Sequence, residues 1–181
     1  KFGFSVGTAG DVNGDGYSDI IVGAYQVNDG QFSAGAAYLY AGSASGLATV
    51  AAWTVEGVQG SASFGVSVAS AGDVNVDGYS DVIVGASQFL DGPGRVGKAY
   101  LYLGSASGLG TTAAWTVESD QPDSYFGYAV ATAGDVNGDG YGDVIIGAFN
   151  YDNGQLDEGR AFVYLGSASG LATSAAWTAE S

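Results

Sequence analysis

Short apolar runs recur along this chain, and the segments between them have turn character rather than the spacing of an amphipathic helix. In the middle of the chain, residues 64–72 alternate bulky and small side chains, which is typical of a half-buried strand. The β-branched run at residues 81–86 predicts a fully buried strand. Two further strands are predicted at residues 97–104 and 113–118, with a turn-rich segment between them.

This four-stranded unit occurs three times, at intervals of 62 residues. Four short antiparallel strands per repeat, with no helix between them, indicate the blade of a propeller. The sequence therefore predicts an all-β chain that forms a β-propeller segment of three four-stranded antiparallel blades. The blades are placed at residues 1–62, 63–124 and 125–181.

Aromatic residues in the predicted strands are assigned to the core. In the third strand of the middle unit, Tyr100 and Tyr102 share one face, and Ala99 and Leu101 occupy the other. Each fourth strand contains one tryptophan, which we interpret as packing between neighbouring blades, with stacking on a sugar as the alternative. These residues are Trp53, Trp115 and Trp177.

An acidic loop of nine residues follows each first strand, as DVNGDGYSD, DVNVDGYSD and DVNGDGYGD. Each copy places side-chain oxygens at loop positions 1, 3, 5 and 9 and a glycine at position 6, an arrangement suited to a hard divalent cation. A single copy could equally be a metal-free turn rich in Asp and Asn. Three copies in register favour calcium. An EF-hand is excluded because position 12 has no glutamate: it is Val22, Val84 or Ile146.

Composition narrows the possible functions. The chain is 46% hydrophobic and 13% aromatic, which is sufficient for a packed core. With 19 acidic and 4 basic residues its net charge is −15, so it has no basic surface for nucleic acid. The absence of His and Cys excludes Ser-His-Asp and Cys-His catalysis, and we expect no enzyme. No run is long and apolar enough to insert in a membrane, and the chain has the character of a mature or excised piece.

The motifs together resemble a known family. A Phe-Gly pair at the start of each unit, the DxNxDGYxD loop and a following Val-Gly-Ala or Ile-Gly-Ala resemble the FG-GAP repeat of integrin alpha-subunit propellers and their bacterial relatives. The resemblance implies three Ca²⁺ sites, with side-chain ligands at positions 1, 3, 5 and 9 and a backbone carbonyl at position 7. The implied ligands are Asp11, Asn13, Asp15, Tyr17 and Asp19; Asp73, Asn75, Asp77, Tyr79 and Asp81; and Asp135, Asn137, Asp139, Tyr141 and Asp143.

The second loop departs from the others at Val76, where they have Gly14 and Gly138. If this position requires a left-handed backbone, a valine there is strained and the second site should bind calcium more weakly.

The links at the opposite end of each unit differ most between copies. They are residues 25–34, 87–96 and 149–158 within units, and 57–63 and 119–125 between units. In an up-and-down blade these links lie on the face opposite the acidic loops, and the resemblance implies that this face contributes to ligand binding. The alternative is ordinary drift in unconstrained loops. Candidate contact residues are Tyr25, Phe32, Phe89, Arg95, Phe149 and Tyr151.

Three blades cannot close a ring, because propellers have about four to eight. We therefore expect either a homodimer that forms a six-bladed ring or further blades in a longer parent chain. The predicted function is a calcium-binding module, extracellular or at the cell surface, for recognition of or adhesion to a protein or glycan. The alternative is a purely structural, calcium-stabilised propeller segment, natural or engineered, that self-assembles and has no ligand of its own.

Overall fold

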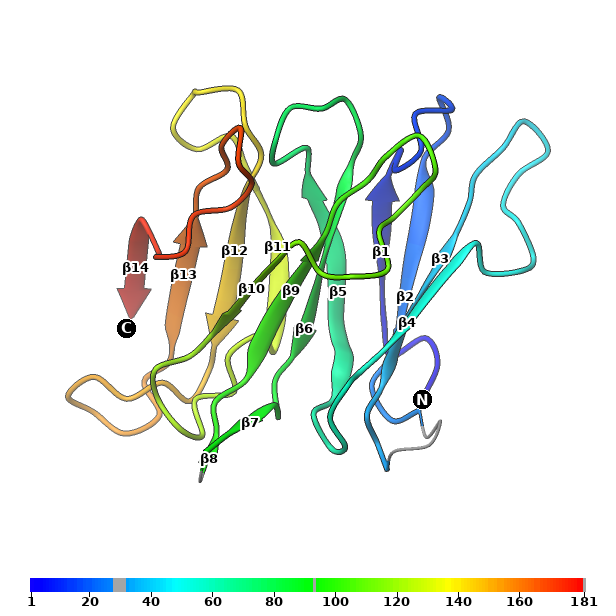
Figure 1. Cartoon of the computed structure of the whole chain (residues 1–181). Helices are drawn as coiled ribbons and strands as arrows, with labels where there is room; N and C mark the ends of the chain where they lie inside the picture. The colour runs from blue at the N-terminus through cyan, green and yellow to red at the C-terminus, as the bar shows by residue number, and fades with distance from the viewer. Residues whose placement is uncertain (28–31, 93, 181) are drawn as a thin grey trace.

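The structure, a computed structural model, describes residues 1–27, 32–92 and 94–180 (Figure 1). The described residues form three four-stranded antiparallel sheets that lie side by side. In the first sheet the strands follow the order of the chain. They are β1 (Ser5–Gly10), β2 (Asp19–Ala24), β3 (Ala36–Tyr40) and β4 (Trp53–Glu56).

The other two sheets repeat this up-and-down order. The second consists of β5 (Phe64–Gly72), β6 (Asp81–Ala86), β9 (Lys98–Tyr102) and β10 (Trp115–Glu118). The third consists of β11 (Ala129–Gly134), β12 (Asp143–Ala148), β13 (Arg160–Tyr164) and β14 (Trp177–Glu180). The prediction of an all-β chain with three four-stranded blades is therefore confirmed.

The second unit also contains a small hairpin that the apolar pattern does not predict. Strands β7 (Leu90–Asp91) and β8 (Gly94–Arg95) pair with each other in the link between β6 and β9. Four residues are too few to show alternation of apolar and polar side chains, so this element has no signal of its own in the sequence.

Each first strand ends in a register irregularity that directs the chain into the acidic loop. The pairing of β1 with β2 shifts between Thr8 and Gly10, and the other sheets shift at the corresponding residues. The glycine at this position has a positive φ in all three copies, 75° at Gly10, 79° at Gly72 and 74° at Gly134. A bulge with a left-handed glycine bends the strand, and the acidic loop therefore leaves every blade in the same direction.

The core lies between the sheets. Side chains of the first and second sheets form one buried cluster, and side chains of the second and third form another. Tyr100 and Tyr102 face the first sheet, whereas Ala99 and Leu101 face the third, as predicted. The middle sheet is therefore apolar on both faces because it packs on both sides.

The tryptophans confirm the packing interpretation in two copies of three. The Trp53 indole N–H donates to the Gly110 carbonyl at 2.9 Å, and its ring meets Tyr102 edge-on with centroids 5.1 Å apart. Trp115 makes the corresponding contacts with Ala172 and Tyr164. For Trp177 the prediction is not tested: this residue is 52% exposed on the outer face of the third sheet, where the described residues provide no following blade.

The two ends of each blade form two rims. The acidic loops between first and second strands lie along one rim, at the top of Figure 1, and the variable links lie along the other. The expected separation of these two sets of loops is confirmed. Part of the first variable link, residues 28–31, and residue 93 of the second lie outside the described residues.

Candidate metal centres

The first acidic loop is organised by the carboxylate of Asp11. Its Oδ1 accepts hydrogen bonds from the N–H groups of Gly14 (2.7 Å) and Asp15 (3.1 Å), and its Oδ2 accepts one from Gly16 (2.8 Å). One side chain therefore gathers three N–H groups that a tight loop would otherwise leave unpaired. Asp135 makes the same three bonds in the third loop.

Two further oxygens of the loop are fixed in the same manner. Asn13 Oδ1 accepts from the Asp15 N–H at 3.0 Å, and Asp15 Oδ1 accepts from the Tyr17 N–H at 3.0 Å. The second and third loops repeat both bonds at 3.0–3.2 Å. The oxygens at positions 1, 3 and 5 thus lie around one turn of backbone in every copy.

These hydrogen bonds keep the first aspartate ionised. At Asp11 desolvation is the largest single cause and acts to raise the pKa, but the hydrogen bonds from the N–H groups of Gly16, Gly14 and Asp15 together lower it below the usual value. At Asp135 the bond from Gly140 is the largest cause of a lowered pKa. In the first and third loops, position 1 is therefore a fixed negative charge at neutral pH.

The ninth position differs from the others because its side chain is fully buried. Asp19 Oδ2 accepts from the Val12 N–H at 3.0 Å, and its Oδ1 accepts from the Gly42 N–H at 2.8 Å. Asp81 and Asp143 make the same pair of bonds at 2.8–2.9 Å. This aspartate ties the acidic loop to the link between the third and fourth strands. The sequence motif implies only a ligand role for it; the glycine repeated at 42, 104 and 166 is the signal for the second role.

Like charges surround this buried carboxylate. Burial raises the pKa of Asp81 to about 6, the N–H bonds from Val74 and Gly104 oppose the rise, and the charges of Asp77 and Asp73 add to it. No lysine or arginine occurs in any of the three nine-residue loops. A bound cation would neutralise this repulsion.

The donor set fits calcium. Each loop offers three carboxylates, one amide and one backbone carbonyl, all oxygen donors, and Ca²⁺ prefers such ligands. A carboxylate oxygen that accepts one N–H bond keeps lone-pair capacity for a cation. Within the described ranges no three acidic side chains already converge as a metal cluster.

The second loop carries the strain that the sequence suggests. Val76 has φ 57°, beside 73° for Gly14 and 75° for Gly138, so the left-handed backbone at this position is confirmed. The N–H of Gly14 and that of Gly138 each donate to the first aspartate at 2.7 Å. In the part of the chain that the structure describes, Val76 makes no corresponding bond to Asp73.

Neighbouring acidic loops are also bonded to each other. The Ser80 N–H of the second loop donates to the Asp11 carbonyl at 2.9 Å, and the Gly142 N–H of the third donates to the Asp73 carbonyl at 2.8 Å. The Tyr79 ring covers Gly14 so closely that an added Cβ would lie 2.8 Å from it. The three loops form one continuous chain of contacts along the rim.

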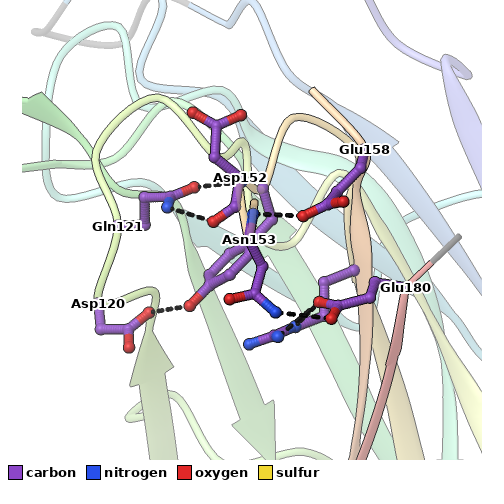
Figure 2. Close-up of polar contacts among 8 residues, drawn as sticks. Asp120, Gln121, Asp152, Asn153, Glu158 and Glu180 are labelled. Atoms are coloured by element: carbon purple, nitrogen blue, oxygen red, sulfur yellow. Dashed lines mark hydrogen bonds and ion pairs between the residues drawn. The ribbon is translucent and has the colours of Figure 1, made fainter. Parts of the chain in front are cut away.

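The opposite rim has a repeated element that the sequence comparison missed. Gln59 donates to the Leu90 carbonyl at 2.9 Å and accepts from the Leu90 N–H at 2.6 Å. Gln121 makes the same pair of bonds to Asp152, at 2.8 Å and 2.6 Å (Figure 2). Both glutamines stand in links that otherwise differ, and their spacing of 62 residues is the signal that could have identified them.

In the third unit, the variable link 149–158 is held by polar contacts (Figure 2). The Tyr151 hydroxyl donates to Asp120 at 3.0 Å, and the Asn153 amide donates to Glu180 at 2.6 Å. The Asn153 N–H also donates to Glu158. The acidic groups of this region are therefore positioned by the fold.

The proposed contact residues of this rim differ in how exposed their side chains are. Phe32 and Phe149 are exposed, by 75% and 48%. Tyr151 is buried against Phe162, with the Arg160 guanidinium 4.6 Å above its ring, so its assignment to a binding surface is wrong. Phe89 packs against the first core cluster and is only partly available.

Up-and-down blades packed face to face, each with an oxygen-rich loop between its first two strands, define a propeller-type repeat protein. The FG-GAP repeat family matches residues 2–40, 64–102 and 126–164, and the chain belongs to this family. The family is non-enzymatic, which agrees with the prediction of no catalysis, and its repeats commonly bind Ca²⁺. The described part of the chain contains no helix of the length and hydropathy that crossing a membrane requires.

The curated relatives include integrin alpha subunits. Integrin alpha-6 of Homo sapiens is 35% identical over 152 residues, which cover 83% of this chain and 13% of that protein. Integrin alpha-V of Gallus gallus is 33% identical over 178 residues, covering 92% of this chain and 16% of that protein. The chain thus spans well under a quarter of the length of these relatives.

Proposed function

We propose that the chain is a calcium-stabilised propeller module with one Ca²⁺ in each acidic loop. The observation that carries this proposal is the threefold repeat of one carboxylate-to-backbone geometry in loops that contain no basic residue. The ligands would be the oxygens at positions 1, 3, 5 and 9 and the carbonyl at position 7, as in the sets given above. The role of calcium is to hold the loop closed, since five protein groups would supply most of the roughly six to eight oxygen ligands that Ca²⁺ takes.

Calorimetric titration of calcium into the chain tests this proposal. We expect uptake of three ions, with affinities in the range of extracellular modules, about 10⁻⁴–10⁻³ M or somewhat tighter. Asp139→Ala should remove one ion, and Asp91→Ala, in the opposite rim, should remove none. Absence of heat at millimolar calcium, with melting unchanged by chelator, would contradict the proposal.

We further propose that the rim opposite the acidic loops recognises a protein or glycan outside the cell or at its surface. Relatives named as integrins support the location, and a bacterial source stays a prediction. The support within the fold is a cluster of partly exposed aromatic rings: Phe149 stacks on Tyr125 at 5.0 Å and meets Tyr128 edge-on at 4.8 Å. The surrounding acidic groups favour a partner with hydroxyl or basic groups.

A glycan array and a panel of extracellular proteins, probed with the calcium-saturated chain, test this second proposal. Binding should weaken with Phe149→Ala and persist with Val50→Ala, which replaces an exposed apolar side chain in the link between β3 and β4, on the calcium rim. Equal effects of both variants, or no ligand in either panel, would instead favour the structural alternative.

A further inference from the structure

The junction between the first and second blades contains a cavity of about 440 Å³. Val55 and Glu56 of β4 form part of one side, and residues of the second blade form the other. A cavity of this volume is within the range of small-molecule sites, about 300–1,000 Å³. Because both blades around it are part of the described chain, the cavity does not depend on where the sequence begins or ends.

Five side chains with hydroxyl groups line this cavity. Within the described residues, no hydrogen bond to a protein group reaches any of these hydroxyls. Two of the five side chains are tyrosines that are only 9% and 3% exposed, and a tyrosine hydroxyl usually has a partner when it is buried. No described side-chain oxygen is sealed from solvent without a partner, so both hydroxyls reach the open space of the cavity. The five residues are Tyr100, Tyr102, Thr111, Thr112 and Thr116.

The tyrosines offer their hydroxyls to a ligand rather than the faces of their rings. Tyr100 meets Phe64 edge-on with ring centroids 5.2 Å apart, and Tyr102 meets Trp53 in the same way at 5.1 Å, so the rings belong to the core. Burial raises the pKa of Tyr102 to about 12, and burial is also the largest cause of a raised pKa at Tyr100. Both groups therefore stay protonated at neutral pH and can each donate and accept a hydrogen bond.

The junction between the second and third blades has a smaller counterpart of this cavity, about 240 Å³ in volume. Phe162 stands there in place of Tyr100, so one phenol hydroxyl is missing. Its acidic side chains bind groups of the chain itself: Glu118 pairs with Lys98 at 2.6 Å, and Asp120 accepts a tyrosine hydroxyl at 3.0 Å. The larger volume and the additional hydroxyl are therefore properties of the first junction and not requirements of blade packing.

We propose that the first junction binds one saccharide unit of a glycan, with sugar hydroxyls bonded to Tyr100, Tyr102 and the neighbouring threonines. Sugar hydroxyls both donate and accept, as the groups of this cavity do. The C–H face of a sugar ring suits the apolar side chain of Val55, and Glu56 offers a charged acceptor. A basic side chain of a protein partner fits less well, because hydroxyls outnumber carboxylates among the described lining residues. This site is separate from the acidic loops and from the Phe149 cluster, and it rests on neither proposal above.

Nuclear magnetic resonance titration of the whole chain tests the proposal. The probes are the methyl glycosides of glucose, galactose, mannose and N-acetylglucosamine. At least one should shift the amide signals of Val55, Thr111 and Thr112, with a dissociation constant in the millimolar range expected of so small a ligand. Tyr100→Phe should weaken this binding by about three- to tenfold, the effect of losing one hydrogen bond. The variant should stay folded, because Phe162 occupies the same position in the third blade.

A matched pair of threonine variants makes the result specific. Thr116→Val removes a hydroxyl that lines the cavity, opposite Tyr100 in the sheet, and should also weaken binding. Thr54→Val makes the same change at the same strand position of the first blade, outside both junction cavities, and should have no effect.

Three outcomes would overturn the proposal. If none of the four glycosides shifts the cavity signals, the cavity holds water only. Shifts confined to residues 149–158 would place glycan binding on the variable rim instead. Shifts at the cavity with arginine amide, but with no glycoside, would indicate a basic side chain of a protein partner.

Discussion

The two rims of this molecule are built on the same blades but vary in opposite ways. On the acidic rim, residue types repeat almost without change, because each oxygen has a specific N–H group to bind. On the opposite rim the residues differ while parts of the backbone repeat. Positive φ values recur at Ser61 and Asp123 and again at Ser63 and Tyr125. The acidic rim has nearly the same side chains in every copy of the repeat, whereas the opposite rim repeats parts of the backbone conformation and varies the side chains.

This contrast explains how one repeat can combine stability with variable recognition. Gln59 and Gln121 fix the links of the second rim through main-chain atoms, so neighbouring side chains are free to vary. Loops held on a rigid scaffold are common positions for binding residues. The difference between the rims can be tested by perturbing each in turn.

Removal of calcium should have the largest effect, and it should be confined to the acidic rim. At a free concentration ten times the Kd, each site contributes about 1.4 kcal/mol, so three sites contribute about 4 kcal/mol. Thermal melting with calcium and with chelator measures the total. Hydrogen exchange should accelerate at residues 11–19 and their repeats. Acceleration mainly at residues 149–158 would contradict the expectation that calcium acts on the acidic rim alone.

The variant Asp81→Ala should destabilise the fold even in chelator. It leaves the N–H groups of Val74 and Gly104 without their buried acceptor, at a cost of about 1–3 kcal/mol each, or roughly 3 kcal/mol in total. Urea unfolding of Asp81→Ala and of the exposed control Asp91→Ala provides the comparison. Equal stability of the two variants would mean that the ninth position serves only as a ligand.

On the opposite rim, Gln121→Ala should cost about 1–2 kcal/mol, since two hydrogen bonds to Asp152 are lost. Calcium affinity should not change, because the residue lies on the other rim. Unfolding and calcium titration of the same variant separate these two effects, with the exposed Gln155→Ala as control. A weaker calcium affinity would show that the rims are coupled.

The smallest expected effect is at Val76. A valine in the left-handed conformation costs roughly 1–2 kcal/mol of folding free energy. Glycine removes this cost but loses more backbone entropy on folding, so Val76→Gly should stabilise the fold by about 0.5–1 kcal/mol. It should also tighten the second calcium site. The matched variant is Gly138→Val, where an added Cβ meets nothing within 4 Å and only the backbone is strained. If neither variant changes calcium affinity, strain at this position does not control binding.

Much of this fold follows from local pattern. The predicted strands 64–72 and 81–86 coincide with β5 and β6, because a bulge glycine and a buried aspartate mark their inner ends. The left-handed backbone at Val76 was predictable because glycine occupies that position in the other two copies. In both cases the determining information lies within a few residues.

The features that sequence did not predict depend on neighbours in space. Trp177 has the sequence context of Trp115 but a different environment, because only the latter is covered by a following sheet. Tyr151 belongs to a variable link, and its burial follows from Asp120 and Arg160, which approach from other elements. The blade boundaries and the ligand sets stay predictions.

The up-and-down order of the strands also has a mechanical consequence. Among the described residues, each four-stranded sheet pairs only within its own blade, and neighbouring blades share a single isolated backbone bridge, Gly35 with Phe64 and Gly97 with Phe126, rather than a continuous ladder. When the two ends of the chain are pulled apart, a blade can therefore unravel while its neighbour stays folded. Each such event would release one repeat, about 210 Å of extended chain at roughly 3.4 Å per residue. The molecule should lengthen under load in equal steps rather than fail at once.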